Sequence, residues 1–178
     1  GQVGLVQTAT FAGSNVGTNI SVTSTSLLNG ALAGNYSLIQ PTGLVASITR
    51  KDLTVAGSTV ITKIYDATTA ATLSGGSLVG LVPSDSTTTL ATPVGTFLDA
   101  TVGTGIPVTS AYSLSGALSG NYRLIQPAGL TGTITKAVLT VSPVAGQSKI
   151  YGSSDPALTY TLSGYVGGET AAQGLSGL

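Results

Sequence analysis

The feature that most constrains this chain is an internal repeat. Two stretches that begin at Ala31 and Ala117, 86 positions apart, read ALAGNYSLIQPTGLVASITR and ALSGNYRLIQPAGLTGTITK. The same offset aligns residues 11–55 with residues 97–141 without a gap, and 26 of these 45 pairs are identical. Lys-Ile-Tyr at positions 63–65 also returns 86 positions later, at 149–151. Such a period indicates a tandem array of similar units.

The repeat divides the chain into three segments. We expect residues 1–50 to be the back part of one unit, residues 51–136 to be a complete unit, and residues 137–178 to open a third. We therefore expect the chain to be one part of a longer tandem array. No flexible linker separates the units, which favours a stiff, elongated arrangement.

The local pattern of residues is that of strands. Segments rich in Val, Ile, Thr, Leu and Tyr are separated by clusters of Gly, Pro, Asn, Asp and Ser. Leu130 and Ile134 alternate with threonines, which places them on one face of a strand. We predict an all-β chain made of tandem immunoglobulin-like β-sandwich modules, because such a module has about seven short strands. The alternative is a β-solenoid, whose coils are usually much shorter than this repeat.

The repeated stretch contains a pattern typical of a tyrosine corner. In sandwiches of this kind a tyrosine opens a strand, and its hydroxyl bonds back to an upstream backbone carbonyl. Tyr36 and Tyr122 are the candidates. The Gln-Pro pairs that begin at Gln40 and Gln126 should end or bend the strand, because proline cannot donate to a ladder.

The composition argues against nucleic-acid binding, metal binding, catalysis and membrane insertion. Six basic and six acidic residues cancel, so no field attracts nucleic acid. Cysteine and histidine are absent, which removes the usual metal ligands, thiol nucleophile and general base. No apolar run approaches the roughly 18 residues that span a bilayer. The carboxylates are scattered singly as expected of turn residues, at Asp52, Asp66, Asp85, Asp99, Asp155 and Glu169. We predict no enzyme activity, no metal and no cofactor.

Several motifs together resemble a known family. KIYDATTAATLSGGSLVGLV (63–82), followed by VGTGIPVT and LSGNYRLIQPAGLTGTITKAVLTV, is similar to the YDG module. KIYGSSDPALTYTLSGYVGGET (149–170) resembles the start of the MBG module of the YGX type. One departure is that Ala67 stands where the family has its name-giving glycine. The resemblance implies tandem modules of large secreted, filamentous-haemagglutinin-like adhesins, many of them exported by two-partner secretion in Gram-negative bacteria.

Comparison of the copies separates scaffold residues from candidate ligand contacts. Lys63 and Tyr65 recur as Lys149 and Tyr151, which indicates a folding role at the start of a module, with the lysine exposed at a strand edge. The alternative for Lys63 is a covalent crosslink to Asn121. Tyrosines that do not recur are candidates for contact with polysaccharide, and these are Tyr112, Tyr160 and Tyr165.

These observations lead to one expected function and one alternative. We expect a structural stalk region of a bacterial cell-surface or secreted adhesin, which holds a binding domain away from the cell. Its partners would be neighbouring modules of the same long chain, and this fragment would insert into no membrane. In the alternative, the modules themselves bind polysaccharide or associate with like modules on other cells.

Overall fold

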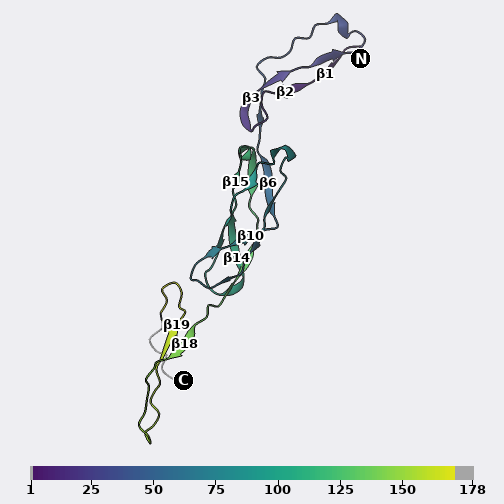
Figure 1. Ribbon diagram of the computed structural model, residues 1–178. Coiled ribbons are helices and arrows are strands. Elements are labelled where there is room, and N and C mark those ends of the chain that lie inside the picture. Colours follow the sequence, from purple (N-terminus) through teal and green to yellow (C-terminus); the bar gives the residue numbers. More distant parts are fainter. Residues whose placement is uncertain (1, 171–178) are drawn as a thin grey trace. The chain divides into compact units, whose positions relative to one another are not determined.

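The computed structural model describes residues 2–170, which form strands, turns and short 3-10 helices (Figure 1). The 3-10 helices are η1 (Ala33–Asn35), η2 (Pro83–Asp85) and η3 (Ser119–Asn121). No α-helix occurs among residues 2–170, so the all-β prediction is confirmed. Within the same residues no helix has the length and apolar character that crossing a bilayer requires.

The described residues form two compact units, each assembled from separate segments. Unit 1 contains residues 2–54, 78–91 and 114–125, and unit 2 contains residues 55–77, 92–113 and 126–170. The predicted module boundaries after residues 50 and 136 describe sequence repeats rather than these units, and they stay a prediction. The last eight residues of the predicted third segment, 171–178, lie outside the described residues.

A five-stranded sheet forms the centre of unit 2. Its order is β8 (Lys63–Ile64), β17 (Thr131–Thr135), β14 (Gly103–Ala111), β13 (Val94–Phe97) and β9 (Ala70–Ala71). Neighbouring strands are antiparallel except β8 and β17. The pair β7 (Thr59–Val60) and β10 (Leu73–Ser74) is also antiparallel. This mainly antiparallel pairing is compatible with the predicted sandwich and differs from a parallel solenoid.

The core of unit 2 is built on this sheet. Phe97, Val108 and Ile134 are buried, and Val60 and Leu73 pack against them. Gly132 lies among these side chains, because a Cβ there would come within 2.6 Å of Val60 and 2.7 Å of Phe97. The close approach of the phenyl ring therefore requires glycine at this position. The other pair of strands in this unit is antiparallel and consists of β18 (Thr140–Pro143) and β19 (Tyr160–Ser163), which are labelled in Figure 1.

Unit 1 contains the remaining sheets. One has the order β11 (Ser77–Val79), β6 (Lys51–Ala56) and β16 (Tyr122–Ile125), in which β6 and β16 run parallel. A second has the order β2 (Ala9–Phe11), β3 (Gly17–Ser24) and β5 (Val45–Ile48). Two further pairs are β1 (Gly4–Val6) with β4 (Leu27–Asn29), and β12 (Thr89–Leu90) with β15 (Leu114–Ser115).

The sequence repeat is also a repeat of strand register. β3 and β5 align Gly17 with Ile48 and Ile20 with Ala46, and β14 and β17 pair the residues 86 positions later. Both pairs contain the same irregularity in register. Within it, Asn19 has φ 54° and its counterpart Gly105 has φ 66°. The bulge requires positive φ, which glycine and asparagine adopt more readily than other residues.

Burial differs sharply between the two copies. Phe97 is 1% exposed, but its counterpart Phe11 is 41% exposed. Tyr122 is 5% exposed, whereas Tyr36 is 63% exposed. Residues 122–125 form β16 beside β6, while their counterparts 36–39 lie outside any strand. Nearly the same sequence therefore forms a strand, with its tyrosine buried, only where a partner strand accompanies it.

Candidate functional site

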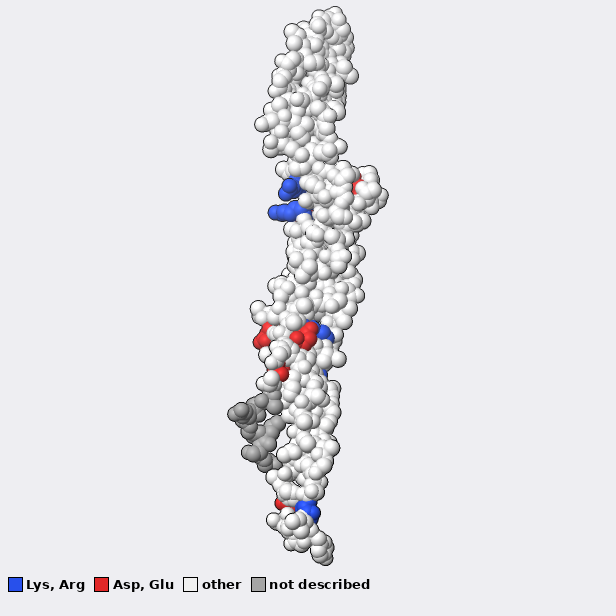
Figure 2. Space-filling model, turned by 60° about the vertical axis from the view of Figure 1, so that its left-hand side comes forward, with Lys and Arg blue, Asp and Glu red and all other residues white. Residues whose placement is uncertain are grey.

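Charged side chains are few and dispersed. The face shown in Figure 2 is mostly neutral, with small separate groups of basic and acidic residues. Within residues 2–170, no three His, Cys, Asp or Glu side chains gather where they could hold a metal ion. The sites that can be described are therefore small polar networks built around the repeated motifs.

The first network surrounds Tyr122, at the start of β16. Its hydroxyl donates to Oδ2 of Asp85 at 2.6 Å and accepts the N–H of Val82 at 3.3 Å. Burial, followed by the hydrogen bond to Asp85, raises the pKa of Tyr122. The hydroxyl thus ties the strand to η2, but its partners are a carboxylate and an N–H rather than the predicted carbonyl. Asp85 lies outside the aligned residues 11–55 and 97–141, so comparison of the two copies could not identify it.

Removing this hydroxyl tests the network. We expect Tyr122→Phe to lower the melting temperature and the urea midpoint of the chain, because Asp85 and Val82 lose a buried partner. Tyr36→Phe is the matched control, and it should leave both values unchanged because Tyr36 is exposed. Equal effects of the two substitutions in thermal and urea unfolding would contradict this role for Tyr122.

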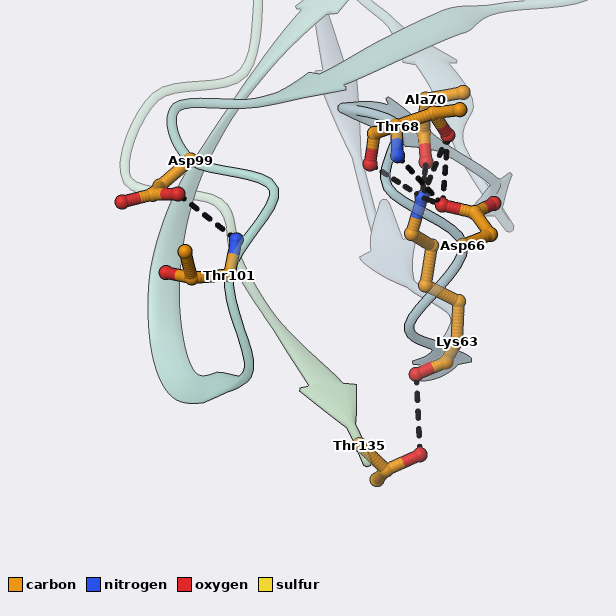
Figure 3. A network of polar contacts seen from close by, with 7 residues as sticks. All are labelled: Lys63, Asp66, Thr68, Ala70, Asp99, Thr101 and Thr135. Carbon is orange, nitrogen blue, oxygen red and sulfur yellow. Dashed lines mark hydrogen bonds and ion pairs between the residues drawn. The ribbon is translucent and has the colours of Figure 1, made fainter. Parts of the chain in front are cut away.

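The second network surrounds Lys63 on the edge strand β8 (Figure 3). Its ammonium group donates to Oδ1 of Asp66 at 2.6 Å, to the carbonyl of Thr68 at 2.7 Å and to the carbonyl of Ala70 at 3.0 Å. The Thr68 hydroxyl also accepts from it, and the ammonium lies 5.8 Å from the centre of the Phe97 ring. The predicted edge position is correct, but the side chain is only 17% exposed. Lys63 holds the turn at residues 66–68 against β9.

The carboxylate in this network is strongly acidic. The hydrogen bond from Lys63, then those from the N–H and hydroxyl of Thr68, lower the pKa of Asp66 from 3.8 to about 2. The hydrogen bond from Arg123 lowers the pKa of Asp52, and the N–H of Thr101 lowers that of Asp99. Figure 3 includes the last of these contacts, which is 2.8 Å long.

These lowered pKa values predict acid sensitivity. As the pH falls, these carboxylates take up protons in the unfolded chain before they do so in the folded chain. The contribution of the three carboxylates to stability is therefore complete above about pH 4 and is lost towards about pH 2. We expect a nearly constant melting temperature between about pH 5 and 8, and a decline below about pH 4. Asp66→Asn should lower stability at neutral pH and make the decline shallower. A steep loss of melting temperature between pH 5 and 8 would count against this account.

The turn held by Lys63 contains the departure from the family pattern. Ala67 has φ 61°, a left-handed conformation that glycine adopts more readily than alanine. For an L-residue other than glycine, this conformation costs about 1–2 kcal/mol. Glycine avoids that cost, but ordering its more flexible backbone on folding lowers stability by about 0.5–1 kcal/mol relative to alanine. We expect Ala67→Gly to raise the free energy of unfolding by about 0.5–1 kcal/mol in urea titrations. Ala70→Gly on β9 should lower it, and a loss of stability in both variants would contradict the argument.

The second occurrence of the Lys-Ile-Tyr motif is more exposed than the first. Lys149 forms an ion pair with Asp155, so each lysine of the motif has a nearby carboxylate partner. Tyr65 packs against the core of unit 2, and its hydroxyl donates to Glu169, which raises the pKa of Tyr65. Tyr151 is fully exposed. The lysine contact is therefore shared by the two motifs, and the packing of the tyrosine is not.

Among the tyrosines predicted to contact polysaccharide, Tyr112 requires a correction. It is buried, and its hydroxyl lies 2.8 Å from Oγ of Ser58. The lack of a tyrosine at the aligned Ser26 suggested a surface role, but the residue packs inside unit 2. Tyr160 is exposed on β19, and Tyr165 is half-buried. The structure therefore does not bring these three side chains together as one exposed surface.

Sequence reasoning missed a function of the repeated glutamine. The amide group of Gln126 donates to the carbonyl of Tyr112 at 2.8 Å, and its oxygen accepts the N–H of Tyr112 at 2.8 Å. Gln40 likewise donates to the carbonyl of Ser26, the residue aligned with Tyr112, at 2.7 Å. We call this pairing the glutamine clamp. It replaces ladder bonds where β16 has ended before Pro127, and the recurrence of Gln-Pro was the available signal.

A polar contact in unit 1 involves η3 and the loop before β3. The side chain of Asn121 accepts the N–H of Val16 at 2.9 Å and donates to the side chain of Asn15 at 2.9 Å. Arg50 donates to the carbonyl of Gly120 at 3.2 Å. The Asn121 side chain thus bonds to residues 15 and 16, and the Lys63 ammonium group bonds to its own turn. These bonds leave the crosslink considered for Lys63 and Asn121 without structural support.

The chain is an all-β repeat in which the recurring glutamines bind the backbone of their own unit. Two known domain families match parts of it. Residues 49–130 match the family model of the YDG domain, and residues 139–177 match that of the MBG domain (YGX type). These matches support the predicted tandem order of the two modules. Residues 11–44 are related to part of the YDG match, residues 97–130, through the internal repeat. No curated protein and no solved structure matches the chain.

Proposed function

We propose that the chain is a structural repeat region, or stalk, of a bacterial cell-surface or secreted adhesin, where it holds a binding domain away from the cell. The observation that carries this proposal is the succession of YDG and MBG domain matches on a repeat whose shared side chains bond within their own compact unit. Such a chain would lie outside a Gram-negative cell, and its partners would be neighbouring modules.

We also propose that the chain catalyses no reaction and binds no cofactor. The carboxylates have structural partners: Asp52 binds Arg123, Asp66 binds Lys63, and Asp85 binds Tyr122. Asp99 caps a turn at Thr101, and Asp155 binds Lys149. General acid–base chemistry requires a carboxyl group directed at a substrate, and these groups are directed at their own chain.

The alternative function is that the modules themselves bind polysaccharide or like modules. The exposed ring of Tyr160 on β19 favours it, because an exposed tyrosine can stack on a sugar ring. One experiment separates the two functions. The purified chain is titrated with a panel of bacterial and host polysaccharides, and its self-association is followed by sedimentation.

The stalk predicts no saturable binding at high micromolar concentrations and a monomer in sedimentation. Saturable binding of a polysaccharide that is lost in Tyr160→Ala would overturn the stalk as the function of these modules. Ser77→Ala on β11 is a suitable control, because this small exposed residue offers no ring to a sugar.

A further inference from the structure

The repeated Gly-Asn-Tyr tripeptide contacts two different parts of the chain. In the second copy, the hydroxyl of Tyr122 bonds to Asp85 of η2, and both residues belong to the YDG match. The side chain of the neighbouring Asn121 bonds instead to Asn15 and Val16, which precede the YDG match and belong to the first copy. The tyrosine therefore holds its own domain together, whereas the asparagine reaches back to the preceding copy.

The contact is made on the loop between β2 and β3, whose residues 13–16 we call the hairpin tip. The N–H of Val16 donates to Oδ1 of Asn121 at 2.9 Å, and the amide nitrogen of Asn121 donates to Oδ1 of Asn15 at 2.9 Å. An asparagine side chain carries an acceptor and a donor on one planar group, so it can satisfy both partners at once. A residue with a shorter or an apolar side chain would lose both bonds.

Polar contacts rather than close packing hold the hairpin tip in place. A cavity of about 330 Å³ lies beside it in unit 1, and the hairpin tip, the start of β6, η2 and η3 contribute to its lining. A further bond joins Nε of the exposed Arg50, which lies between β5 and β6, to the carbonyl of Gly120 at 3.2 Å. Because a cavity replaces an interlocking core here, the position of the hairpin tip depends on a few hydrogen bonds.

The corresponding loop, 86 positions later, uses its side chains differently. There Asp99 accepts the N–H of Thr101 at 2.8 Å, so the loop bonds to itself. The aligned residues of the hairpin tip are Gly13, which has no side chain, and Asn15. The loop that bonds to itself is followed by the MBG match, and residues 137–178 contain no asparagine. The hairpin tip, whose side chain reaches the next domain, is followed by the YDG match.

We propose that the hairpin tip is a docking surface for the Gly-Asn-Tyr segment of a following YDG domain, and that Asn121 fixes the orientation of that domain relative to the preceding copy. The partner that fits this surface carries an asparagine at the end of its η3 helix. The proposal adds a joint to the proposed stalk without depending on what the stalk carries. Its failure is distinguishable from failure of the stalk, because orientation and polysaccharide binding are measured separately.

Spin-label distances across the joint test this proposal. The 178-residue chain contains no cysteine, so two introduced cysteines carry labels without background. Thr23→Cys on β3 and Thr54→Cys on β6 are suitable, because both threonines are exposed and lie on opposite sides of the joint. We expect one narrow distance distribution in double electron–electron resonance. Asn121→Ala should increase the population outside this peak about two- to tenfold, as expected from the loss of a hydrogen bond.

Three further variants sharpen the test. Asn35→Ala is the matched control, because this exposed asparagine is the aligned residue of the first copy, and the distribution should stay narrow. Asn121→Asp keeps the acceptor for Val16 but cannot donate to Asn15, so it should broaden the distribution less than Asn121→Ala does. Gly13→Asp combined with Asn15→Thr copies the loop that bonds to itself. It should also broaden the distribution partly, because the bond from Val16 remains.

Three results would overturn the proposal. The first is a distribution in the labelled parent chain that is as broad as that of Asn121→Ala. The second is a narrow distribution that survives in Asn121→Ala, because the connection between β5 and β6 would then fix the orientation alone. The third is equal broadening in Asn35→Ala. Urea unfolding of each labelled variant separates a loosened joint from a loss of folding, and Asn121→Asp carries the same test if Asn121→Ala does not fold.

Discussion

Replacing Phe97 by alanine is expected to lower the free energy of unfolding by about 3–5 kcal/mol, the usual cost of removing a buried aromatic ring. Phe97 is 1% exposed and packs with Val108 and Ile134. The ring also fills the space left by Gly132, so its removal creates a cavity in the centre of unit 2. The effect is measured as the change in the urea midpoint at constant slope.

The chain supplies its own control for this substitution. Phe11 occupies the aligned position in the first copy and is 41% exposed. Phe11→Ala should lower the free energy of unfolding by well under half as much as Phe97→Ala, because water already reaches this ring and its removal leaves little cavity. Similar losses in the two variants would contradict the conclusion that the cores of the copies differ.

The second large effect is expected at the glutamine clamp. Gln126→Leu leaves both the N–H and the carbonyl of the buried Tyr112 without their partner, and we expect a loss of about 1–3 kcal/mol. Gln126→Glu keeps an acceptor for the N–H but cannot donate to the carbonyl. Its stability should lie between those of the wild type and the leucine variant.

The first copy again provides the comparison. Gln40→Leu removes a bond to the carbonyl of Ser26, which water reaches more easily than the backbone of Tyr112. We therefore expect Gln40→Leu to cost less than Gln126→Leu in urea unfolding. If the free energy of unfolding of Gln126→Leu lies within about 0.5 kcal/mol of the wild-type value, the glutamine clamp contributes little to stability and proline alone ends the strand.

Much of the local structure could be predicted from the residues. The 86-residue offset identified segments that adopt the same strand register, including the bulge at Asn19 and Gly105. The Gly-Asn-Tyr pattern marked the start of β16 correctly. The YDG and MBG resemblances agree with the family matches at residues 49–130 and 139–177. Such features depend on turn chemistry and alternation, which act over a few residues.

The partners of the candidate side chains were harder to predict. Tyr112 was expected at the surface because it does not recur, yet its ring is buried next to Ser58 and Gly76. The hydroxyl of Tyr122 was expected to bond to a carbonyl, but Asp85 lies 37 positions earlier in the chain and accepts it. Neither Ser58 nor Asp85 lies within the aligned residues 11–55 and 97–141. Comparison between copies therefore identified the recurring side chain without identifying what it contacts.

The sequence by itself determined the all-β class and which positions repeat. The tertiary structure alone decided which of the repeated residues are buried. Phe11 and Phe97, or Tyr36 and Tyr122, have the same neighbours in sequence but opposite exposure. The physical reason is that strand pairing and apolar burial are supplied by segments distant in the chain. Residues 122–125 become a strand because β6 lies beside them, and no such segment accompanies residues 36–39 among the described residues.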